Sequence, residues 1–214
     1  MKNPVLAPST PEDDVVAERI AQQTLASRGS DYAAEVRRLL DAGREEMARR
    51  GTSSRPRVAD IVAAAGLSND AFYRHFASKD ALVAAILEDG TVRLLGYLAH
   101  QMDKEATPEG KVHRWVEGVL AQAADEASAA TTLAVLWNGG NIVDVSKRPE
   151  TALAALIETS FAELGSVEPA LHASLVAHAL VGKLSDLLQD RVRPTNADIR
   201  RITDFCLRAV RPSA

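Results

Sequence analysis

Hydrophobic residues recur three or four positions apart along most of the chain, which is the spacing of amphipathic helices. Proline, glycine and capping residues divide this pattern into segments. We expect helices over residues 11–27, 31–50, 56–65, 68–76, 79–103, 109–130, 131–145, 149–164, 168–190 and 195–210. The sequence shows no strand-like alternation, internal repeat or low-complexity tract. The pattern therefore predicts an all-α protein.

The first 30 residues are predicted to be an N-terminal extension that contains the helix 11–27. Thr10 can cap this helix, and Pro11 suits its first turn. Gly29 is expected to end the helix, because glycine is common just beyond helix termini. The next helix, residues 31–50, is expected to stop at Gly51 for the same reason.

The composition narrows the class of protein. Of the 214 residues, 46% are hydrophobic, 25% are charged and only 4% are aromatic, as in a globular chain with an aliphatic core. The longest apolar run covers residues 81–87, far short of the roughly 20 residues that span a membrane. The single cysteine, Cys206, excludes an intramolecular disulfide and a cysteine-based structural zinc site. No leader-like segment opens the sequence, so we expect a cytoplasmic protein.

The net charge of -4 discourages an anionic partner such as nucleic acid, but the charge is unevenly distributed. Residues 81–214 carry a net charge of -4. Residues 44–79 contain seven Lys and Arg against four Asp and Glu, a net charge of +3. This basic segment is compatible with phosphate contact, although a solvated helix face is the more common origin of such a pattern.

The distinctive stretch is residues 58–79, which read as two short helices joined by a tight turn. Ala65 is small enough for a close helix crossing, and Gly66 can adopt the positive φ that ends the first helix. Phe72 and Phe76, four apart, give the second helix its inner face. This is the geometry of a helix-turn-helix, whose second helix enters the major groove. From periodicity alone, an ordinary helical hairpin in a globular core is the alternative.

This stretch resembles the DNA-binding domain of the TetR-like (tetracycline-repressor) family of transcriptional regulators. The match covers about residues 58–83 and consists of Ile61, Ala65-Gly66-Leu67-Ser68, Phe72-Tyr73-Arg74-His75-Phe76, Ser78-Lys79-Asp80 and Leu82. Beyond about residue 100 the resemblance is one of architecture. It implies a three-helix helix-turn-helix domain at residues 31–80 and an effector-binding and dimerisation domain at 81–214, with 79–103 as the connecting helix.

The resemblance also implies roles for individual residues. Tyr73, Lys79 and His75 are expected to contact DNA phosphates. Arg55 and Arg57 precede the first short helix, where the family often has a capping threonine, and arginine can still reach phosphate. Base readout is expected around Ser68, from Asn69, Asp70, Ala71 and Arg74.

Three of these positions depart from the family's usual residues. Asn69, Asp70 and Ala71 stand where the family often has Lys or Gln, Gly or Pro, and a hydroxyl residue, so no operator sequence follows. Asp70 suits a helix N-terminus but repels a nearby phosphate. It either accepts a hydrogen bond from a cytosine amino group or stabilises the turn.

In the family, the C-terminal helices form a ligand pocket and a dimer interface. Interface candidates occupy two helices: Leu171, Leu175, Ala179, Leu180, Leu184, Leu187 and Leu188, then Ile199, Ile202, Phe205 and Val210. An intramolecular core is the alternative reading of the same periodicity. Candidates for the pocket are the aromatic, polar and flexible side chains Tyr97, Met102, Trp115, Leu136, Trp137, Asn138, Asn141, Phe161 and His178.

The resulting hypothesis is a homodimeric repressor that a small-molecule effector releases from a near-palindromic operator. No catalytic, cofactor-binding or metal-binding motif is present, so we expect no enzyme activity, no cofactor and no metal. Two alternatives remain open. One is a helical module that binds protein partners and has lost DNA recognition, and the other is a DNA-binding regulator without an effector. The sequence also leaves open whether the N-terminal extension packs on the DNA-binding domain, a partner subunit or DNA.

Overall fold

A computed structural model describes residues 11–139 and 148–210. Within these ranges every regular element is helical, which confirms the predicted all-α class. Along the chain the elements are α1 (Pro11–Arg50), α2 (Val58–Ala65), α3 (Asn69–His75), α4 (Lys79–Met102), α5 (Pro108–Leu120), the 3-10 turn η1 (Ala121–Ala123), α6 (Glu126–Gly139), α7 (Pro149–Glu163), α8 (Pro169–Gln189) and α9 (Asn196–Val210).

Side-chain caps and prolines explain several of the helix starts. Ser78 Oγ accepts a hydrogen bond from the amide of Ala81 at 3.1 Å and so begins α4. Thr107 caps α5 in the same way, with the amide of Gly110 as donor at 3.1 Å. Proline occupies the first turn of α5, α7 and α8, where its missing N–H is not needed. These starts agree with the predicted ones to within a residue or two.

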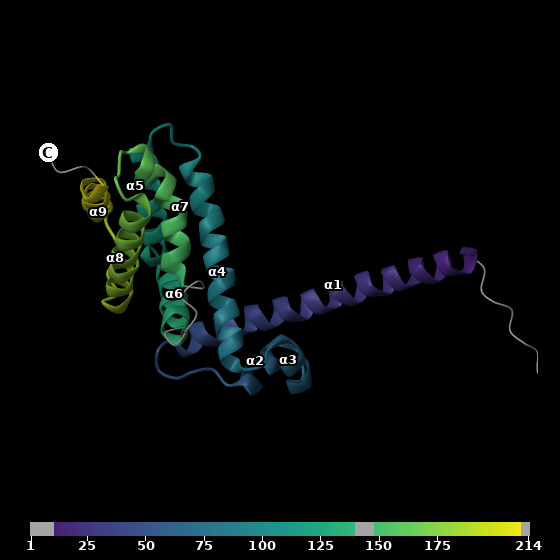
Figure 1. The fold of residues 1–214 in the computed structure, drawn as a ribbon. Coiled ribbons are helices and arrows are strands. Elements are labelled where there is room, and N and C mark those ends of the chain that lie inside the picture. Colours follow the sequence, from purple (N-terminus) through teal and green to yellow (C-terminus); the bar gives the residue numbers. More distant parts are fainter. Residues whose placement is uncertain (1–10, 140–147, 211–214) are drawn as a thin grey trace, which may run out of the picture.

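The predicted break at Gly29 is wrong, because α1 is one continuous helix of 40 residues. Gly29 is not among the glycines with positive φ, and a helical glycine costs only about 1 kcal/mol relative to alanine. In Figure 1 the N-terminal part of α1 extends away from the other helices.

A second correction concerns the predicted helix 109–130, which is interrupted. α5 ends at Leu120, the 3-10 turn η1 follows, and α6 begins at Glu126. The Asp125 carboxylate accepts a hydrogen bond from the amide of Ser128 at 2.9 Å, so a side chain starts the new helix without any glycine or proline. Backbone and side-chain hydrogen bonds from Ser128 also lower the pKa of Asp125.

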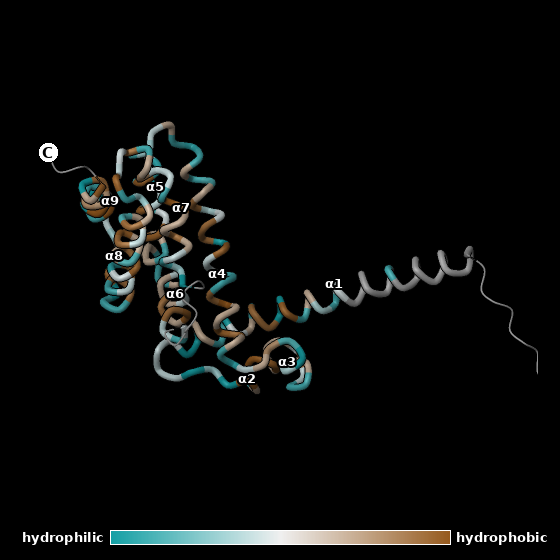
Figure 2. The backbone as a smooth tube through the Cα atoms, in the orientation of Figure 1, coloured by the Kyte–Doolittle hydropathy of each residue, from teal (hydrophilic) through white to brown (hydrophobic). Residues whose placement is uncertain are grey.

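Two clusters of buried side chains hold the helices together. The N-terminal cluster joins α1, α2, α3, the start of α4 and Ala134 of α6, with Leu39, Met47 and Phe72 fully buried. The C-terminal cluster joins the end of α4 with α5 and α7–α9, around Trp115 and Phe161. Hydrophobic and hydrophilic positions alternate along these helices in Figure 2, as expected for helices that bury one face.

α4 contributes buried side chains to both clusters, and α6 also contacts both, with Ala134 buried in the N-terminal cluster and Leu133 and Leu136 packed against the C-terminal one. The first half of α4 contributes Leu82 and Ile86 to the N-terminal cluster, and its second half contributes Leu98 and Met102 to the C-terminal cluster. At 1.5 Å per residue, its 24 residues span about 36 Å. Any displacement of α4 in one cluster is therefore transmitted to the other.

The crossing of α4 and α5 gives a first test of this packing. A Cβ added at Gly118 would overlap the buried side chain of Leu98 and lie 3.3 Å from a ring carbon of Tyr97. Because Leu98 is fully buried and would have to shift, Gly118→Ala is expected to lower the free energy of unfolding by about 1–3 kcal/mol. Chemical denaturation measures this change.

Gly96→Ala is the matched control on α4. Its added Cβ meets no atom of the described residues within 4 Å, so the variant is expected to be about 0.5–1 kcal/mol more stable. A Gly118→Ala variant as stable as Gly96→Ala would contradict the close crossing of α4 and α5.

Candidate functional site

The turn between α2 and α3 has the left-handed residue that the sequence predicts. Gly66 has φ 64° and ψ 38° and ends α2. The amide of Leu67 donates to the carbonyl of Val62 at 2.9 Å, which closes the helix end. Ser68 then caps α3, its Oγ accepting from the amide of Ala71 at 3.1 Å. The predicted pair of short helices joined by a tight turn is confirmed.

The outer face of α3 carries four of the residues that were expected to contact DNA. Asn69, Asp70, Tyr73 and Arg74 are all exposed, and Tyr73 has 59% of its surface accessible. Ser68 is also exposed, at the N-terminus of the helix. The face is therefore aromatic and polar, and it is presented by a helix too short to be stable without the core beneath it.

Ala71 and His75, which were expected on this surface, are buried instead. Ala71 is 3% exposed, and the His75 side chain is also 3% exposed. For His75 the reason is α1, which packs against this side of α3. Tyr32 of α1 contacts the His75 ring edge-on, with ring centroids 4.8 Å apart. The position of α1 relative to α3 was not predicted, and the resemblance alone does not indicate that the side chains of Ala71 and His75 are covered.

Glu35 of α1 holds α3 through two side chains. Its Oε2 lies 2.7 Å from His75 Nε2 and 3.3 Å from Arg74 Nη2. The hydrogen bond from His75 is the main cause that lowers the pKa of Glu35, and the positive charge of Arg74 adds to it. Sequence reasoning missed Glu35, because nothing local indicates a partner 40 residues away.

This contact predicts a pH dependence. The folded state lowers the pKa of Glu35 below its ordinary 4.5, so the stabilisation is complete above about pH 4.5. It is lost as the pH falls through the lower folded-state pKa. We expect the free energy of unfolding to decrease as the pH falls through this acid range. For the Glu35→Gln variant we expect the same free energy to decrease less steeply. Urea unfolding between pH 3 and pH 7 measures this, and parallel curves for the two proteins would contradict it.

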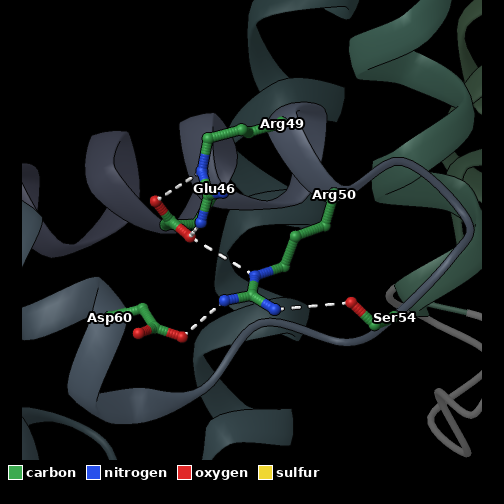
Figure 3. Close-up of polar contacts among 5 residues, drawn as sticks. All are labelled: Glu46, Arg49, Arg50, Ser54 and Asp60. Carbon is green, nitrogen blue, oxygen red and sulfur yellow. Dashed lines mark hydrogen bonds and ion pairs between the residues drawn. The ribbon is translucent and has the colours of Figure 1, made fainter.

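A polar cluster joins the end of α1 to the start of α2 (Figure 3). The Arg50 guanidinium donates to Asp60 at 2.5 Å, and to Glu46 and Ser54 at 3.4 Å. Glu46 also accepts from Arg49, which is the main cause that lowers the Glu46 pKa. The cluster fixes the intervening loop, and with it the approach to α2.

Arg57 occupies the N-cap position of α2, which the sequence left unassigned. Its backbone is extended, with φ -94° and ψ 146°, and its side chain makes no capping hydrogen bond. Arg55, Arg57 and Lys79 form no ion pair within the described ranges, whereas the other cations of the basic segment do: Arg44, Arg49, Arg50 and Arg74. The three cations without a carboxylate partner all flank α2 and α3.

A cavity of about 370 Å³ lies between α1, α4, η1 and the helices α5–α8. Arg44 of α1 and Arg93 of α4 are its charged lining residues, and Thr91, Tyr97 and Gln122 are among its polar ones. Its aliphatic lining consists of Ile86, Leu87, Leu94, Val119, Val135, Leu136, Leu153, Val181 and Leu184. The volume is near the lower end of the roughly 300–1,000 Å³ typical of small-molecule sites.

Of the nine pocket candidates, Tyr97 and Leu136 line this cavity. Met102, Trp115 and Phe161 are buried in the C-terminal cluster instead. Three more candidates lie off the cavity: Trp137 is 42% exposed, Asn138 is buried and donates to the carbonyl of Ala134, and His178 is exposed on α8. The ninth candidate, Asn141, lies outside the described residues. The sequence did not indicate Arg44 or Arg93, because which helices surround the cavity depends on tertiary packing.

The candidate interface residues of α8 and α9 divide into two groups. Leu171, Leu175, Ala179 and Phe205 are exposed, while Ile199 and Ile202 are partly buried. Leu180, Leu184, Leu187, Leu188 and Val210 are buried within the C-terminal cluster. The exposed group leaves an apolar face on these two helices, and the buried group belongs to the core of the chain itself.

The described residues give little support for a reactive thiol, a metal site or a membrane-spanning helix. Burial raises the pKa of the Cys206 thiol to about 12, so the thiol stays protonated at neutral pH. No cluster of three or more metal-ligating side chains occurs in residues 11–139 and 148–210. None of the helices in these ranges combines the length and apolar character that crossing a bilayer requires.

Comparison with known proteins identifies the family of the N-terminal helix-turn-helix region. The sequence model of the bacterial regulatory proteins of the tetR family matches residues 39–86. This range contains the end of α1, all of α2 and α3, and the start of α4. A search of curated proteins found no match.

Several solved structures share the fold. The fatty acid degradation regulator FadR from Bacillus halodurans has a TM-score of 0.61 and 17% identity over 81% of this chain and 94% of its own. RolR in complex with resorcinol has a TM-score of 0.62 and 18% identity over 85% and 90%. A tetR-family regulatory protein from Rhodococcus RHA1 has a TM-score of 0.55 and 19% identity over 84% and 98%.

These similarities extend over the C-terminal helices as well, beyond the residues that the family's sequence model covers. Residues 39–86 therefore form the DNA-binding helix-turn-helix domain of the tetR family, and the chain as a whole shares the all-helical fold of TetR-like transcription regulators.

Proposed function

We propose that the chain is a homodimeric repressor that binds a near-palindromic operator and releases it when a small molecule occupies the cavity. The observation that carries the proposal is the exposed face of α3, with Tyr73 and Arg74 at its centre. It is flanked by Arg55, Arg57 and Lys79, which have no carboxylate partner among the described residues. Polar side chains on a helix surrounded by cations suit a DNA groove and its phosphates.

In this proposal α3 enters the major groove. Asn69 and Arg74 are assigned to base edges, since asparagine pairs with adenine and arginine with guanine. The Tyr73 hydroxyl, Lys79 and the two arginines before α2 are assigned to phosphates. Ser68 and Asp70 act at the N-terminus of α3, where Ser68 caps the helix. The burial of Ala71 and His75 argues against direct contacts from either residue.

The domain boundaries in this proposal are those expected from the sequence. Residues 31–80 form the DNA-binding domain, and residues 81–214 form the effector-binding and dimerisation domain. The two buried clusters support this division, because α1–α3 belong to one and α7–α9 to the other. Residues 1–30 remain an extension whose partner is not assigned.

The exposed apolar face of α8 and α9 is proposed as the dimer interface. Leu175 is 59% exposed and Phe205 is 51% exposed, and apolar side chains at such exposure in two adjacent helices favour association. A two-fold dimer would place two copies of α3 about 34–36 Å apart, one turn of the DNA helix.

Leu175→Glu tests the interface. We expect a monomer at concentrations where the unmodified chain is a dimer, because burying a carboxylate opposite its symmetry mate is unfavourable. We also expect operator affinity to fall at least about tenfold, since the two half-sites are no longer bound together. Sedimentation equilibrium and fluorescence anisotropy measure the two effects. Val92→Glu, at an exposed position of α4, is the control, and this variant should remain dimeric.

The two alternative functions are weaker in view of this geometry. The protein-partner module was motivated partly by the missing hydroxyl at position 71, but Ala71 is buried and would not present a hydroxyl to DNA. A regulator without an effector fits poorly with a partly apolar cavity of about 370 Å³. RolR, which shares the fold, is known in complex with resorcinol, and this supports a small-molecule effector for the present chain.

The function is tested with DNA from around the protein's own gene in an electrophoretic mobility shift. We expect a discrete, salt-sensitive complex. In a cellular reporter, deletion of the regulator's gene should raise expression from the bound promoter. Lower expression after deletion would contradict repression, and absence of any complex would contradict an operator in this DNA.

A further inference from the structure

The charged side chains that line the cavity are all positive. The two charged lining residues, Arg44 and Arg93, are both cationic, and no Asp or Glu is among the lining residues of the described chain. Arg44 comes from α1 and Arg93 from α4. An anionic group is therefore the ligand chemistry that these side chains favour.

Ion pairs hold both arginines in position but leave most of their N–H donors available. Arg44 Nη2 donates to Asp41 at 3.0 Å, and Arg93 Nη2 contacts Asp89 at 2.6 Å. Each pair occupies one nitrogen of a guanidinium that has five N–H donors. Arg37 also binds Asp89 and feels the charge of Asp41, so three guanidinia share two carboxylates. The cluster retains one positive charge.

The rest of the cavity wall is suited to a saturated chain. Ten of its lining residues are aliphatic or proline, and Tyr97 is the aromatic residue among the lining side chains. The hydroxyls of Thr91 and Thr131 donate to the carbonyls of Leu87 and Ala127 within their own helices. Because these protons are already used, the arginines are the strongest donors left for an anion.

We infer that the cavity binds an aliphatic carboxylate, with the carboxylate at Arg44 and Arg93 and the chain against the leucine and valine wall. The inference rests on the proposed ligand-responsive function and specifies its effector class. A bidentate contact from either guanidinium satisfies the carboxylate oxygens. The chain replaces water against apolar side chains.

The same contacts would couple the cavity to DNA. α1 crosses α4 at Gly43, where an added Cβ would lie 2.7 Å from Cδ1 of Ile86. Ile86 lines the cavity, and Arg44 is the next residue of α1. α1 also holds α3 through Glu35 and His75. A ligand that contacts α1 and α4 at their crossing therefore favours one arrangement of these helices, and α3 follows α1.

The test is isothermal titration calorimetry on the full chain in the absence of DNA. Decanoate is the probe, decan-1-ol is the neutral ligand with the same chain length, and acetate is the anion without a chain. We expect decanoate to bind at least about tenfold more tightly than either of the other two. Arg93→Gln and Arg44→Gln should each weaken decanoate about tenfold, as expected for a charge-assisted hydrogen bond, and leave decan-1-ol within about twofold.

Arg200→Gln, an exposed substitution on α9 away from the cavity, is the control and should bind decanoate unchanged. Equal affinity for decanoate and decan-1-ol, or decanoate binding that both cavity variants leave intact, would overturn the inference. Absence of decanoate binding would also overturn it, while release of DNA by another compound would leave the proposed function standing. Decanoate binding without any change in operator affinity would support the ligand class and contradict the proposed release.

Discussion

Replacing Phe72 with alanine is expected to lower the free energy of unfolding by about 3–5 kcal/mol, the usual cost of emptying a buried phenylalanine site. Phe72 is fully buried in the N-terminal cluster and contacts two rings, Tyr73 at 5.2 Å and Phe76 at 5.8 Å between centroids. α3 has only seven residues and depends on this core for its position. Thermal and urea denaturation followed by circular dichroism measure the loss.

Tyr73→Phe is the matched control for this prediction. Tyr73 is adjacent in sequence and also aromatic, but it is mostly exposed, so removing its hydroxyl should change stability by less than about 0.5 kcal/mol. Phe72→Ala therefore reports on the stability of the core, whereas Tyr73→Phe removes a proposed DNA contact and leaves stability nearly unchanged. A Phe72→Ala variant as stable as Tyr73→Phe would contradict the described core of α2 and α3.

The second large effect is expected at Lys79, on DNA affinity. Lys79→Ala should weaken binding about tenfold on every DNA sequence, because the proposed phosphate contact carries no sequence information. In a dimer each subunit loses one contact, so the slope of log affinity against log salt should fall by about two. Fluorescence anisotropy over a salt series measures both quantities.

Tyr73→Phe and Lys104→Ala make this prediction specific. Tyr73→Phe should weaken binding without changing the salt slope, since it removes a neutral hydroxyl. Lys104→Ala removes a lysine just beyond the end of α4, whose ammonium donates to Gln101, and should change neither quantity. An unchanged salt slope for Lys79→Ala would contradict the proposed phosphate contact.

Local signals in the sequence were sufficient for most of the N-terminal region. Gly66 adopts the left-handed conformation, Ser68 and Ser78 cap the helices that follow them, and Phe72 and Phe76 face inward. Each of these features depends on residues within four positions of one another. Such features can be predicted because the interacting atoms are close in the chain as well as in space.

The errors arise where an interaction links distant segments or where two local signals compete. Gly29 does not break α1, because one glycine costs less than continuation of the helix gains. His75 is buried because Tyr32 and Glu35 of α1 cover it, an arrangement invisible in the periodicity of α3. Arg44 and Arg93 line one cavity only because α1 crosses α4 beside Gly43.

The whole-chain charge also proved a poor guide to the proposed DNA-binding surface. Within the basic segment, the arginines of α1 and α3 are partly neutralised by nearby carboxylates such as Glu35 and Glu46. The cations without such partners among the described residues are Arg55, Arg57 and Lys79, which flank α2 and α3. In the proposed function, the position of these cations, rather than the net charge of -4, determines which surface binds phosphate.

The central claim is that α3 reads duplex DNA as part of a dimer. Selection of binding sites from random duplex DNA by the full chain, at about 0.15 M salt, tests it most directly. The account predicts enrichment of a near-palindrome whose half-sites are centred about 10–10.5 base pairs apart or a multiple of that distance. It also predicts that Arg74→Ala relaxes the preference at one base position in each half-site. Failure to enrich any sequence, or an enriched site that Arg74→Ala and Lys79→Ala both bind unchanged, would contradict the account.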